Sequence, residues 1–316
     1  MNYYDVVMLS GDNDIDILPE SIIRNANCPI VYAVEYTHGA RQKINYLETK
    51  SIPQAIVRAG RIGWKEYRRR RAFFASAGMQ MNGYPAFETY GTLSVSPIIY
   101  LDSRATSDIM ATREEMDRRR QRLLSARPLR LYHSGRLERM KGSHQLIPLA
   151  VALQKAEIPF SLDIYGAGSL RADISSAIAS RGLTNLVHLH DPIDYRTQLV
   201  PLMRSDADLF VSCHLQSDPS CTYLETLACG VPIVGYNNRM WSRLRTASSG
   251  GWDVSAGNIS KMASEIGRLH QNRSEIINAS ASGLAFARDH DFDNQFRKRM
   301  DHLARIAGGL PRVRFI

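Results

Sequence analysis

Short apolar runs alternate with helical patterns through the second half of the chain, and this alternation constrains the fold most. The runs that we expect to form strands are 129–133, 160–165, 186–190, 209–213 and 233–236. The helical patterns between them are 145–155, 170–181, 195–204 and 222–229. Apolar strands that alternate with helices are typical of a parallel sheet covered on both faces. The sequence therefore predicts a Rossmann-like α/β domain here.

The first half carries a shorter form of the same pattern. Its expected strands are 3–10, 29–36, 79–84 and 98–101, and its expected helices are 19–27, 52–77 and 107–124. Composition and periodicity both change at residues 125–128, which favours a linker there. We predict two Rossmann-like domains, 1–127 and 128–316, the second with helical patterns from residue 260 that end in a terminal helix at 294–306.

Composition excludes several classes of protein. The 316 residues are 44% hydrophobic and 22% charged, which is ordinary for a globular protein. No apolar run reaches the ~20 residues of a membrane-spanning helix, and the early acidic residues are unlike a signal peptide. We expect a cytoplasmic protein. Its four cysteines, Cys28, Cys213, Cys221 and Cys229, form no CxxC pair, which indicates reduced thiols rather than a metal site.

The net charge of +9 favours an anionic partner. Nucleotide phosphates, anionic lipid headgroups and nucleic acid are all negatively charged and are therefore candidate partners. Part of it lies in two arginine runs, 68–71 and 118–120, each of which is either a solvated helix face or a surface for an anionic membrane. No aromatic residues are interleaved among these arginines, so we expect no nucleic-acid partner.

Two segments that follow expected strands carry groups suited to phosphate. In GRLERMKG, at 135–142, Gly135 lets the backbone approach a ligand, while Arg136 and Lys141 can aim two cations at one diphosphate. The alternative is a surface loop with solvated charges. After the next strand, Gly166 and Gly168 form a two-glycine turn. Because the carboxyl ends of parallel strands share one edge of the sheet, both segments should line the same site.

A third segment follows the strand at 209–213. Pro219 suits the first position of a helix, after which Ser220, Cys221 and Thr222 would present free backbone N–H groups. Such a helix start attracts phosphate through these donors and through the macrodipole. Glu225 lies one turn further in. Together the three segments predict a nucleotide site.

GRLERMKG, DIYGAGSL and DPSCTYLETLACGVPIV resemble, in this order, the C-terminal domain of family 4 retaining glycosyltransferases of the GT-B fold (glycosyl transferases group 1). The resemblance covers about 128–306. It implies two facing Rossmann-like domains, a sugar nucleotide bound by the second, and a terminal helix that crosses back to the first. It further implies that Arg136 and Lys141 hold the diphosphate, that residues 220–222 cap the distal phosphate, and that Glu225 binds the ribose hydroxyls. Gly166 and Gly168 would let the nucleotide lie against the backbone.

The chain departs from the family in two places. The family pairs two glutamates separated by seven residues, and the first contacts the donor sugar. That spacing back from Glu225 gives Ser217, while the adjacent Asp218 can serve if the loop is one residue shorter. The family's opening strand and glycine-rich turn are also not intact. The first domain is therefore either shortened or begins partway.

The resemblance implies an enzyme that moves a sugar from a nucleoside diphosphate sugar to a hydroxyl of a glycan or lipid-linked acceptor, with retention. Such chemistry needs no cofactor and no metal, and Arg136, Lys141 and Asp218 would be its catalytic residues. Basic helices would help at the inner face of an anionic membrane. Two alternatives stay open. One is a GT-B sugar-nucleotide epimerase, and the other is a non-catalytic sugar-nucleotide-binding protein, which the short first domain and the missing glutamate favour.

Other candidate residues have structural interpretations. Asp206 and Asp208 resemble a DxD metal motif but precede a buried strand, so we expect a helix end there. The acidic clusters at 12–14 and 289–293 are interpreted as caps or solvated turns. His38 falls near where the family often has a residue that faces the donor sugar, with Glu35 as its rival. The alternative for His38 is a loop histidine with no role.

Overall fold

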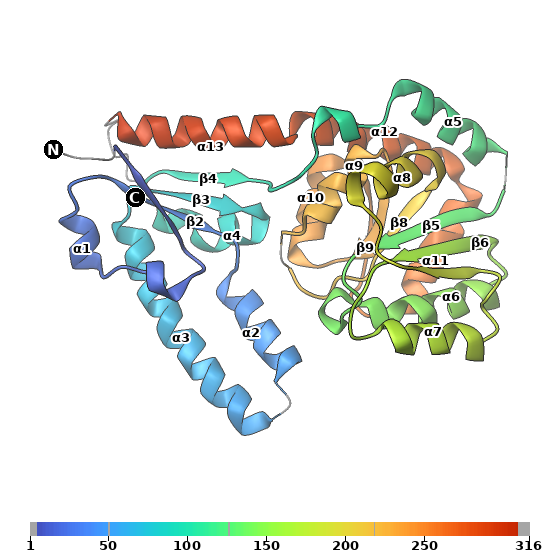
Figure 1. Ribbon diagram of the computed structural model, residues 1–316, viewed down its shortest axis with the longest axis horizontal. Helices are drawn as coiled ribbons and strands as arrows, with labels where there is room; N and C mark the ends of the chain where they lie inside the picture. The colour runs from blue at the N-terminus through green and yellow to red at the C-terminus, as the bar shows by residue number, and fades with distance from the viewer. Residues whose placement is uncertain (1–4, 50, 126, 218, 309–316) are drawn as a thin grey trace. The chain divides into compact units, whose positions relative to one another are not determined.

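The computed structural model describes residues 5–49, 51–125, 127–217 and 219–308. These residues form two compact units. The first takes in the described parts of Met1–Asp102, Ser217–Ser220 and Phe292–Ile316, and the second consists of Ser103–Gln216 and Cys221–Asp291. Each unit has its own parallel sheet (Figure 1). The segment 125–128, interpreted above as a linker, falls within the second unit.

The sheet of the first unit has four parallel strands in sequential order. They are β1 (Val7–Ser10), β2 (Ile30–Val34), β3 (Gly78–Asn82) and β4 (Pro97–Tyr100). Met79 of β3 lies opposite Tyr32 of β2 on one side and Pro97 of β4 on the other. All four strands overlap the predicted runs. The central strands β2 and β3 are largely buried, whereas the edge strands β1 and β4 are mostly half-buried.

Helices pack against this sheet and extend beyond it. They are α1 (Glu20–Arg24), α2 (His38–Glu48), α3 (Ile52–Ala75), α4 (Gly83–Tyr90) and α13 (Phe292–Ala307). The carboxyl half of α3 buries Ala72 and Phe73 in the core, whereas its first half extends away from the sheet together with α2 (Figure 1). The sequence did not predict α2 or α4 as helices.

Helix α13 returns the end of the chain to the first unit. Gln295 accepts the Leu101 N–H at 2.9 Å, just beyond β4. Gln80 of β3 donates to the carbonyl of Arg299 and accepts from its side chain, both at 2.9 Å. His302 is buried beside the same sheet. These polar contacts fix α13 along the strands, so the helix is an integral part of this unit.

The arginine run 68–71 is not simply a solvated helix face. Arg69 is only 3% exposed and forms an ion pair with Asp14. Arg71 pairs with Glu20 at 2.7 Å and with its Nη1 donates to a tyrosine on its own helix. The run holds the loop after β1 and helix α1 against α3. The expectation of a solvated face is wrong for Arg69.

The sheet of the second unit has six parallel strands in the order β10-β9-β8-β5-β6-β7. They are β5 (Leu129–Ser134), β6 (Phe160–Tyr165), β7 (Val187–His190), β8 (Leu209–Ser212), β9 (Ile233–Tyr236) and β10 (Gly251–Val254). The first five match the predicted runs within a residue at each end. The order runs outward from β5 in both directions, so a switch point lies between β5 and β8, where α/β proteins bind ligands.

Helices cover both faces of the second sheet (Figure 1). They are α5 (Arg113–Leu124), α6 (Leu146–Lys155), α7 (Arg171–Ser180), α8 (Val200–Asp206), α9 (Cys221–Ala228), α10 (Arg239–Ser248), α11 (Ile259–Gln271) and α12 (Arg273–Asp289). A π-helical segment, η6 (Tyr195–Leu199), precedes α8. None of the helices in the described ranges is both long and apolar enough to cross a bilayer.

The second arginine run, 118–120, contains a core residue. Arg119 of α5 is 1% exposed, and burial lowers its pKa to about 10. Its guanidinium donates to the backbone carbonyls of Met203, Arg204, Ala207, Cys229 and Gly230. One side chain thereby supplies hydrogen-bond donors to the backbone carbonyls at the ends of α8 and α9. The expectation of a solvated face is wrong here too, although Arg118 and Arg120 are exposed.

Candidate active site

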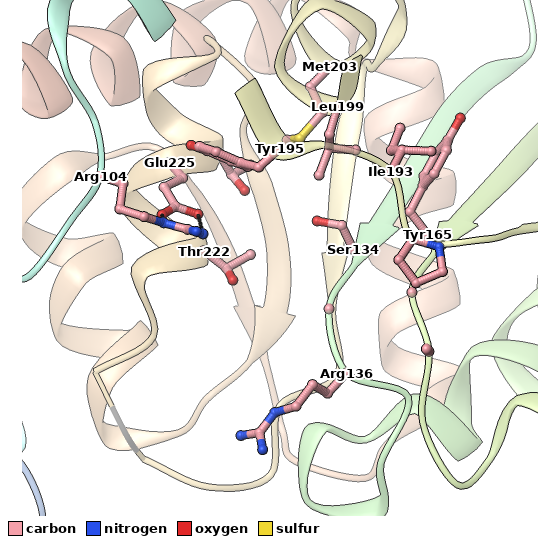
Figure 2. A pocket seen from close by; sticks show the side chains of 15 residues that line it. Arg104, Ser134, Arg136, Tyr165, Ile193, Tyr195, Leu199, Met203, Thr222 and Glu225 are labelled. Atoms are coloured by element: carbon pink, nitrogen blue, oxygen red, sulfur yellow. Dashed lines mark hydrogen bonds and ion pairs between the residues drawn. The ribbon is translucent and has the colours of Figure 1, made fainter. Parts of the chain in front are cut away.

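A pocket of about 400 Å³ opens at the carboxyl ends of β5 and β6 and beside the start of α9 (Figure 2). All the residues that line it belong to the second unit. Those with side chains labelled in Figure 2 are Arg104, Ser134, Arg136, Tyr165, Ile193, Tyr195, Leu199, Met203, Thr222 and Glu225. The predicted glycine turns and helix start therefore do meet at one edge of the sheet.

Glycines bring the turns after β5 and β6 into backbone contact. A Cβ on Gly166 would lie 2.0 Å from the carbonyl oxygen of Gly135, so no side chain fits there. At Gly168 a Cβ would lie 2.5 Å from the Leu137 oxygen, and this glycine is not part of the pocket lining. Gly135 differs, because its Cβ would meet no described atom within 4 Å. The pocket thus has a floor of backbone with open space above Gly135.

The two cations of GRLERMKG that were predicted to bind the diphosphate lie in different surroundings. Arg136 is exposed and lines the pocket. Lys141 is 9% exposed and is not among the lining residues. Its charge acts on the fully buried His214, whose pKa is held well below the usual value by burial and secondarily by Lys141. The structure therefore places Arg136 at the site, while a diphosphate contact by Lys141 stays a prediction.

Helix α9 starts one residue before the predicted pattern 222–229 but after the predicted first helical position, Pro219. It begins at Cys221, so Pro219 precedes the helix and the prediction that it occupies the first helical position is wrong. Cys221 and Thr222 open the helix, and Thr222 lines the pocket. Ser220 groups with the first unit, and Asp218 lies outside the described residues. The amino-terminal end of α9, with the positive end of its dipole, is what this segment supplies to the edge.

Glu225 is the carboxylate of the pocket, and its side chain is 7% exposed. Arg104 donates to both of its oxygens, from Nε at 2.7 Å and from Nη2 at 3.2 Å. The Arg104 guanidinium also lies 4.5 Å from the centre of the Tyr195 ring, and the hydrogen bond to Glu225 raises the pKa of Arg104. Figure 2 shows the three side chains together on one side of the pocket.

Sequence reasoning missed Arg104 and Tyr195. Tyr195 has its hydroxyl buried without a hydrogen-bond partner in the described structure, and burial raises its pKa. It belongs to the π-helical segment, a distortion that is frequent at functional sites. That distortion cannot be read from the sequence. The segment around Arg104, DSRATSD, has no periodicity that marks it as part of a site.

The opposite side of the pocket is apolar and aromatic. Ile193, Leu199 and Met203 supply aliphatic surface. Tyr165, at the end of β6, stacks on His190 with ring centres 4.3 Å apart. Surfaces of this kind bind flat rings, because stacking and apolar burial act together. The pocket thus joins a cationic and hydrogen-bonding end to an apolar end.

The remaining candidates have structural partners. Asp206 ends α8, as predicted, and pairs with Arg130, whereas Asp208 is buried and pairs with Arg122 at 2.9 Å. Among the described residues, no group of three His, Cys, Asp or Glu side chains is placed to hold a metal ion.

In the first unit, Asp12 accepts the N–H groups of Glu35 and Tyr36 at 2.8 and 3.0 Å. His38 begins α2, and its N–H donates to the Tyr90 hydroxyl at 3.0 Å. Its buried Nδ1 has no partner in the described chain. Asp12 therefore fixes the loop after β2, from which the candidates Glu35 and His38 arise.

The chain matches the family model for glycosyl transferases group 1 over residues 115–282. It is 32% identical over 108 residues to the D-inositol 3-phosphate glycosyltransferase of Arthrobacter sp. (strain FB24), a match that covers 33% of this chain and 25% of that protein. The chain thus spans about a quarter of the length of this curated relative.

Two solved structures show the fold. Anabaena HepE in complex with UDP has a TM-score of 0.66 at 16% identity, over 95% of this chain and 79% of that chain. Sucrose-phosphate synthase from Thermosynechococcus elongatus has a TM-score of 0.68 at 15% identity, over 96% and 73%. At these identities the likeness shows the fold alone, two Rossmann-like domains of the GT-B class, as predicted.

Proposed function

The chain belongs to the glycosyl transferases group 1 family, and from that premise we propose that it moves a sugar from a nucleoside diphosphate sugar to an acceptor hydroxyl, with retention at the anomeric carbon. The observation that carries the proposal is the pocket that joins Arg136, the start of α9 and Glu225 at one sheet edge. The UDP bound to HepE supports a nucleoside diphosphate donor, and the name of the Arthrobacter relative supports glycosyl transfer.

The pocket has a matching place for each part of the nucleotide. The diphosphate would lie between Arg136 and the first turn of α9, where a cation and the positive end of the helix dipole both favour negative charge. The ribose hydroxyls would donate to Glu225. The base would lie against the apolar side near Ile193 and Leu199, with the backbone of Gly166 beside it.

The chemistry follows from this placement. As the bond from the anomeric carbon to the diphosphate oxygen breaks, negative charge grows on the leaving diphosphate, and the acceptor hydroxyl supplies the new oxygen while losing its proton. Arg136 and the N–H groups of α9 would stabilise that growing charge without reorganising, which is electrostatic preorganisation. Asp218 is the residue that we propose faces the donor sugar. We propose no metal ion and no cofactor for the reaction.

The acceptor that we propose is a glycan or a lipid-linked sugar, so the product belongs to polysaccharide or cell-envelope synthesis. We place the protein in the cytoplasm, in peripheral contact with an anionic membrane that presents the acceptor. Positive charge supports this, since 40 lysines and arginines stand against 31 acidic residues.

Two measurements test the function. Calorimetry with UDP, GDP and ADP should find one that binds. Release of that nucleotide from its sugar conjugates should then depend on an added acceptor and should survive excess chelator. Nucleotide binding without consumption of any donor would support the non-catalytic alternative. A changed donor sugar without release would support the epimerase. Absence of binding by all three nucleotides would contradict the proposal.

A further inference from the structure

The first half of α3 exposes large apolar side chains along one side. Ile52 is 77% exposed, Ile56 67%, Val57 57% and Trp64 61%. Ile52, Ile56, Gly60 and Trp64 follow at intervals of four residues, which places them within an arc of about 120° on a helix. We call Ile52, Ile56, Val57 and Trp64 the α3 stripe. Soluble proteins rarely expose such a contiguous apolar set unless something covers it.

Contacts of α3 explain why this side is uncovered. Helix α2 packs on a different face, where Asn45 and Gln42 donate to the carbonyls of Ala55 and Ala59 at 2.9 and 3.1 Å. Residues that would bury α3 in the sheet come later, at Ala72 and Phe73. At Gly60, which lies between Ile56 and Trp64 on the same side of the helix, a Cβ would meet no described atom within 4 Å. The stripe therefore lies on the part of α3 that extends beyond the core (Figure 1).

Charge on the same part of the helix is positive only. From Ser51 to Trp64 the sequence contains Arg58 and Arg61 and no acidic residue. Both arginines are exposed, but Arg58 donates to the Thr49 hydroxyl at 3.1 Å and, at 100° per residue, lies on the side of α3 opposite the stripe. Arg61 lies beside the stripe, and Arg68 has its guanidinium 5.1 Å from the centre of the Trp64 ring. Arginine side chains beside an exposed indole are typical of helices that lie in a membrane interface, where the ring is half-buried and the cations reach the headgroups.

We propose that the α3 stripe, with Arg61, docks this protein on an anionic phospholipid surface. The inference rests on the membrane contact in the proposed function and names the residues that make it. A second copy of the chain fits less well, because a two-fold contact through the stripe would bring like charges together with no acidic residue to pair them. Nucleic acid fits less well too, because phosphates would not dehydrate Ile52, Ile56 and Val57.

This surface differs from the arginine run 68–71. Arg70 pairs with Glu66 at 2.9 Å and Arg71 pairs with Glu20 at 2.7 Å, so both cations already have carboxylate partners. Those contacts partly neutralise the charge that a membrane would attract. Membrane binding should therefore depend on Arg61 more than on Arg70 or Arg71.

Vesicle sedimentation tests the apolar part. The full chain should bind vesicles of phosphatidylglycerol and phosphatidylcholine and bind vesicles of phosphatidylcholine alone far less. Ile56→Ser with Trp64→Ser should lower the partition coefficient at least tenfold. Ile22→Ser, which removes another half-exposed helical isoleucine from the same unit, is the matched control and should bind as the wild type does. Equal binding by all three proteins would overturn the proposal.

A second pair of variants tests the charges. Arg61→Gln should lower binding about fivefold at low salt, from ~1 kcal/mol for a cation near the surface. Arg70→Gln removes the same formal charge and should cost less than twofold. If the two variants lose binding equally, net charge rather than the α3 stripe attracts the vesicle, and the assignment is wrong.

Tryptophan emission gives a readout, because of the three tryptophans Trp241 is fully buried, Trp252 is half-buried and Trp64 is exposed. Anionic vesicles should shift the emission to shorter wavelength, and Trp64→Phe should abolish the shift.

Two further measurements separate membrane binding from dimerisation and from nucleotide binding. A wild-type dimer that becomes monomeric in Ile56→Ser with Trp64→Ser would mean that a second copy covers the stripe. Calorimetry should find unchanged nucleotide affinity in that variant. Loss of vesicle binding would then not contradict the proposed function. Failure of the wild type to bind nucleotide would likewise not contradict the membrane surface.

Discussion

Arg104 and Glu225 are joined by two hydrogen bonds, of 2.7 and 3.2 Å, which engage both oxygens of the carboxylate. A ribose diol bound by Glu225 would approach the same two oxygens from the same side. The Arg104 side chain is 64% exposed whereas that of Glu225 is 7% exposed, so the arginine is the partner that can move. Nucleotide binding should therefore displace Arg104 from the carboxylate.

Replacing Glu225 by glutamine should weaken nucleotide binding. The substitution keeps the shape of the side chain and removes charge-assisted acceptance of the ribose hydroxyls, which is worth about 1.5–3 kcal/mol. Calorimetry with the nucleoside diphosphate that binds the wild type would measure the loss. An unchanged affinity, with the far-ultraviolet circular dichroism of the wild type, would mean that the ribose lies elsewhere.

Removing the Arg104 side chain should instead strengthen nucleotide binding. Arg104→Ala frees the carboxylate at the cost of an ion pair that is largely exposed on the arginine side, and such pairs contribute up to about 1 kcal/mol. We expect the nucleotide to bind up to about fivefold more tightly. The same titration compares this variant with Glu225→Gln. If Arg104→Ala weakens binding as much as Glu225→Gln does, Arg104 itself contacts the nucleotide and does not compete with it.

Arg136→Ala should weaken binding of the diphosphate by about 1.5–3 kcal/mol, the range for hydrogen bonds to charged groups. That corresponds to a roughly 10- to 150-fold increase in Kd. Arg139→Ala is the matched control, because Arg139 belongs to the same loop and is exposed but does not line the pocket. Equal losses in the two variants would indicate a general effect of positive charge rather than a contact by Arg136.

Arg119 should be a large contributor to stability. Arg119→Met leaves buried carbonyls of α8 and α9 without donors, and losing one partner of a buried charged network costs about 3 kcal/mol or more. Arg120→Met, on the exposed side of α5, should change the free energy of unfolding by less than about 0.5 kcal/mol. Urea denaturation of both variants measures the difference. Similar midpoints would show that the carbonyls find other donors.

The strands could be predicted because burial on both faces makes them apolar, as in Leu209 to Ser212 of β8. Helices α2 and α10 were not predicted, although α10 has one buried apolar side at a helical spacing that the sequence contains. Both begin at a cap that only the structure reveals: Thr37 accepts the Ala40 N–H and Asn238 accepts the Trp241 N–H. Strand β10 is half-buried at the edge of its sheet, so it carries little apolar signal.

The residues of the candidate site also divide into those that the sequence reveals and those that it does not. Arg136, Thr222 and Glu225 could be found from the sequence because each lies soon after a predicted strand. The topology of a parallel sheet then places the carboxyl ends of these strands at one edge. Arg104 reaches the pocket from 121 residues before Glu225, and no local pattern encodes that contact. Arg119 shows the same limit, since the carbonyls that bury it come from residues 203–230 while its neighbours in sequence are exposed.

Buried histidines should make the protein less stable in mild acid. His214 and His133 are fully buried, and burial lowers the pKa of each below 6.5. Below pH 6.5 the unfolded chain binds protons that the folded chain excludes, so the free energy of unfolding should fall as the pH drops from 7 to 5. Each such group adds at most ~1.4 kcal/mol per pH unit to the slope. His214→Gln should reduce the slope, measured by urea denaturation at several pH values. His188→Gln, at an exposed position of β7, is the control for replacing a histidine. A slope unchanged by His214→Gln would mean that His214 is protonated in the folded protein despite its burial next to Lys141.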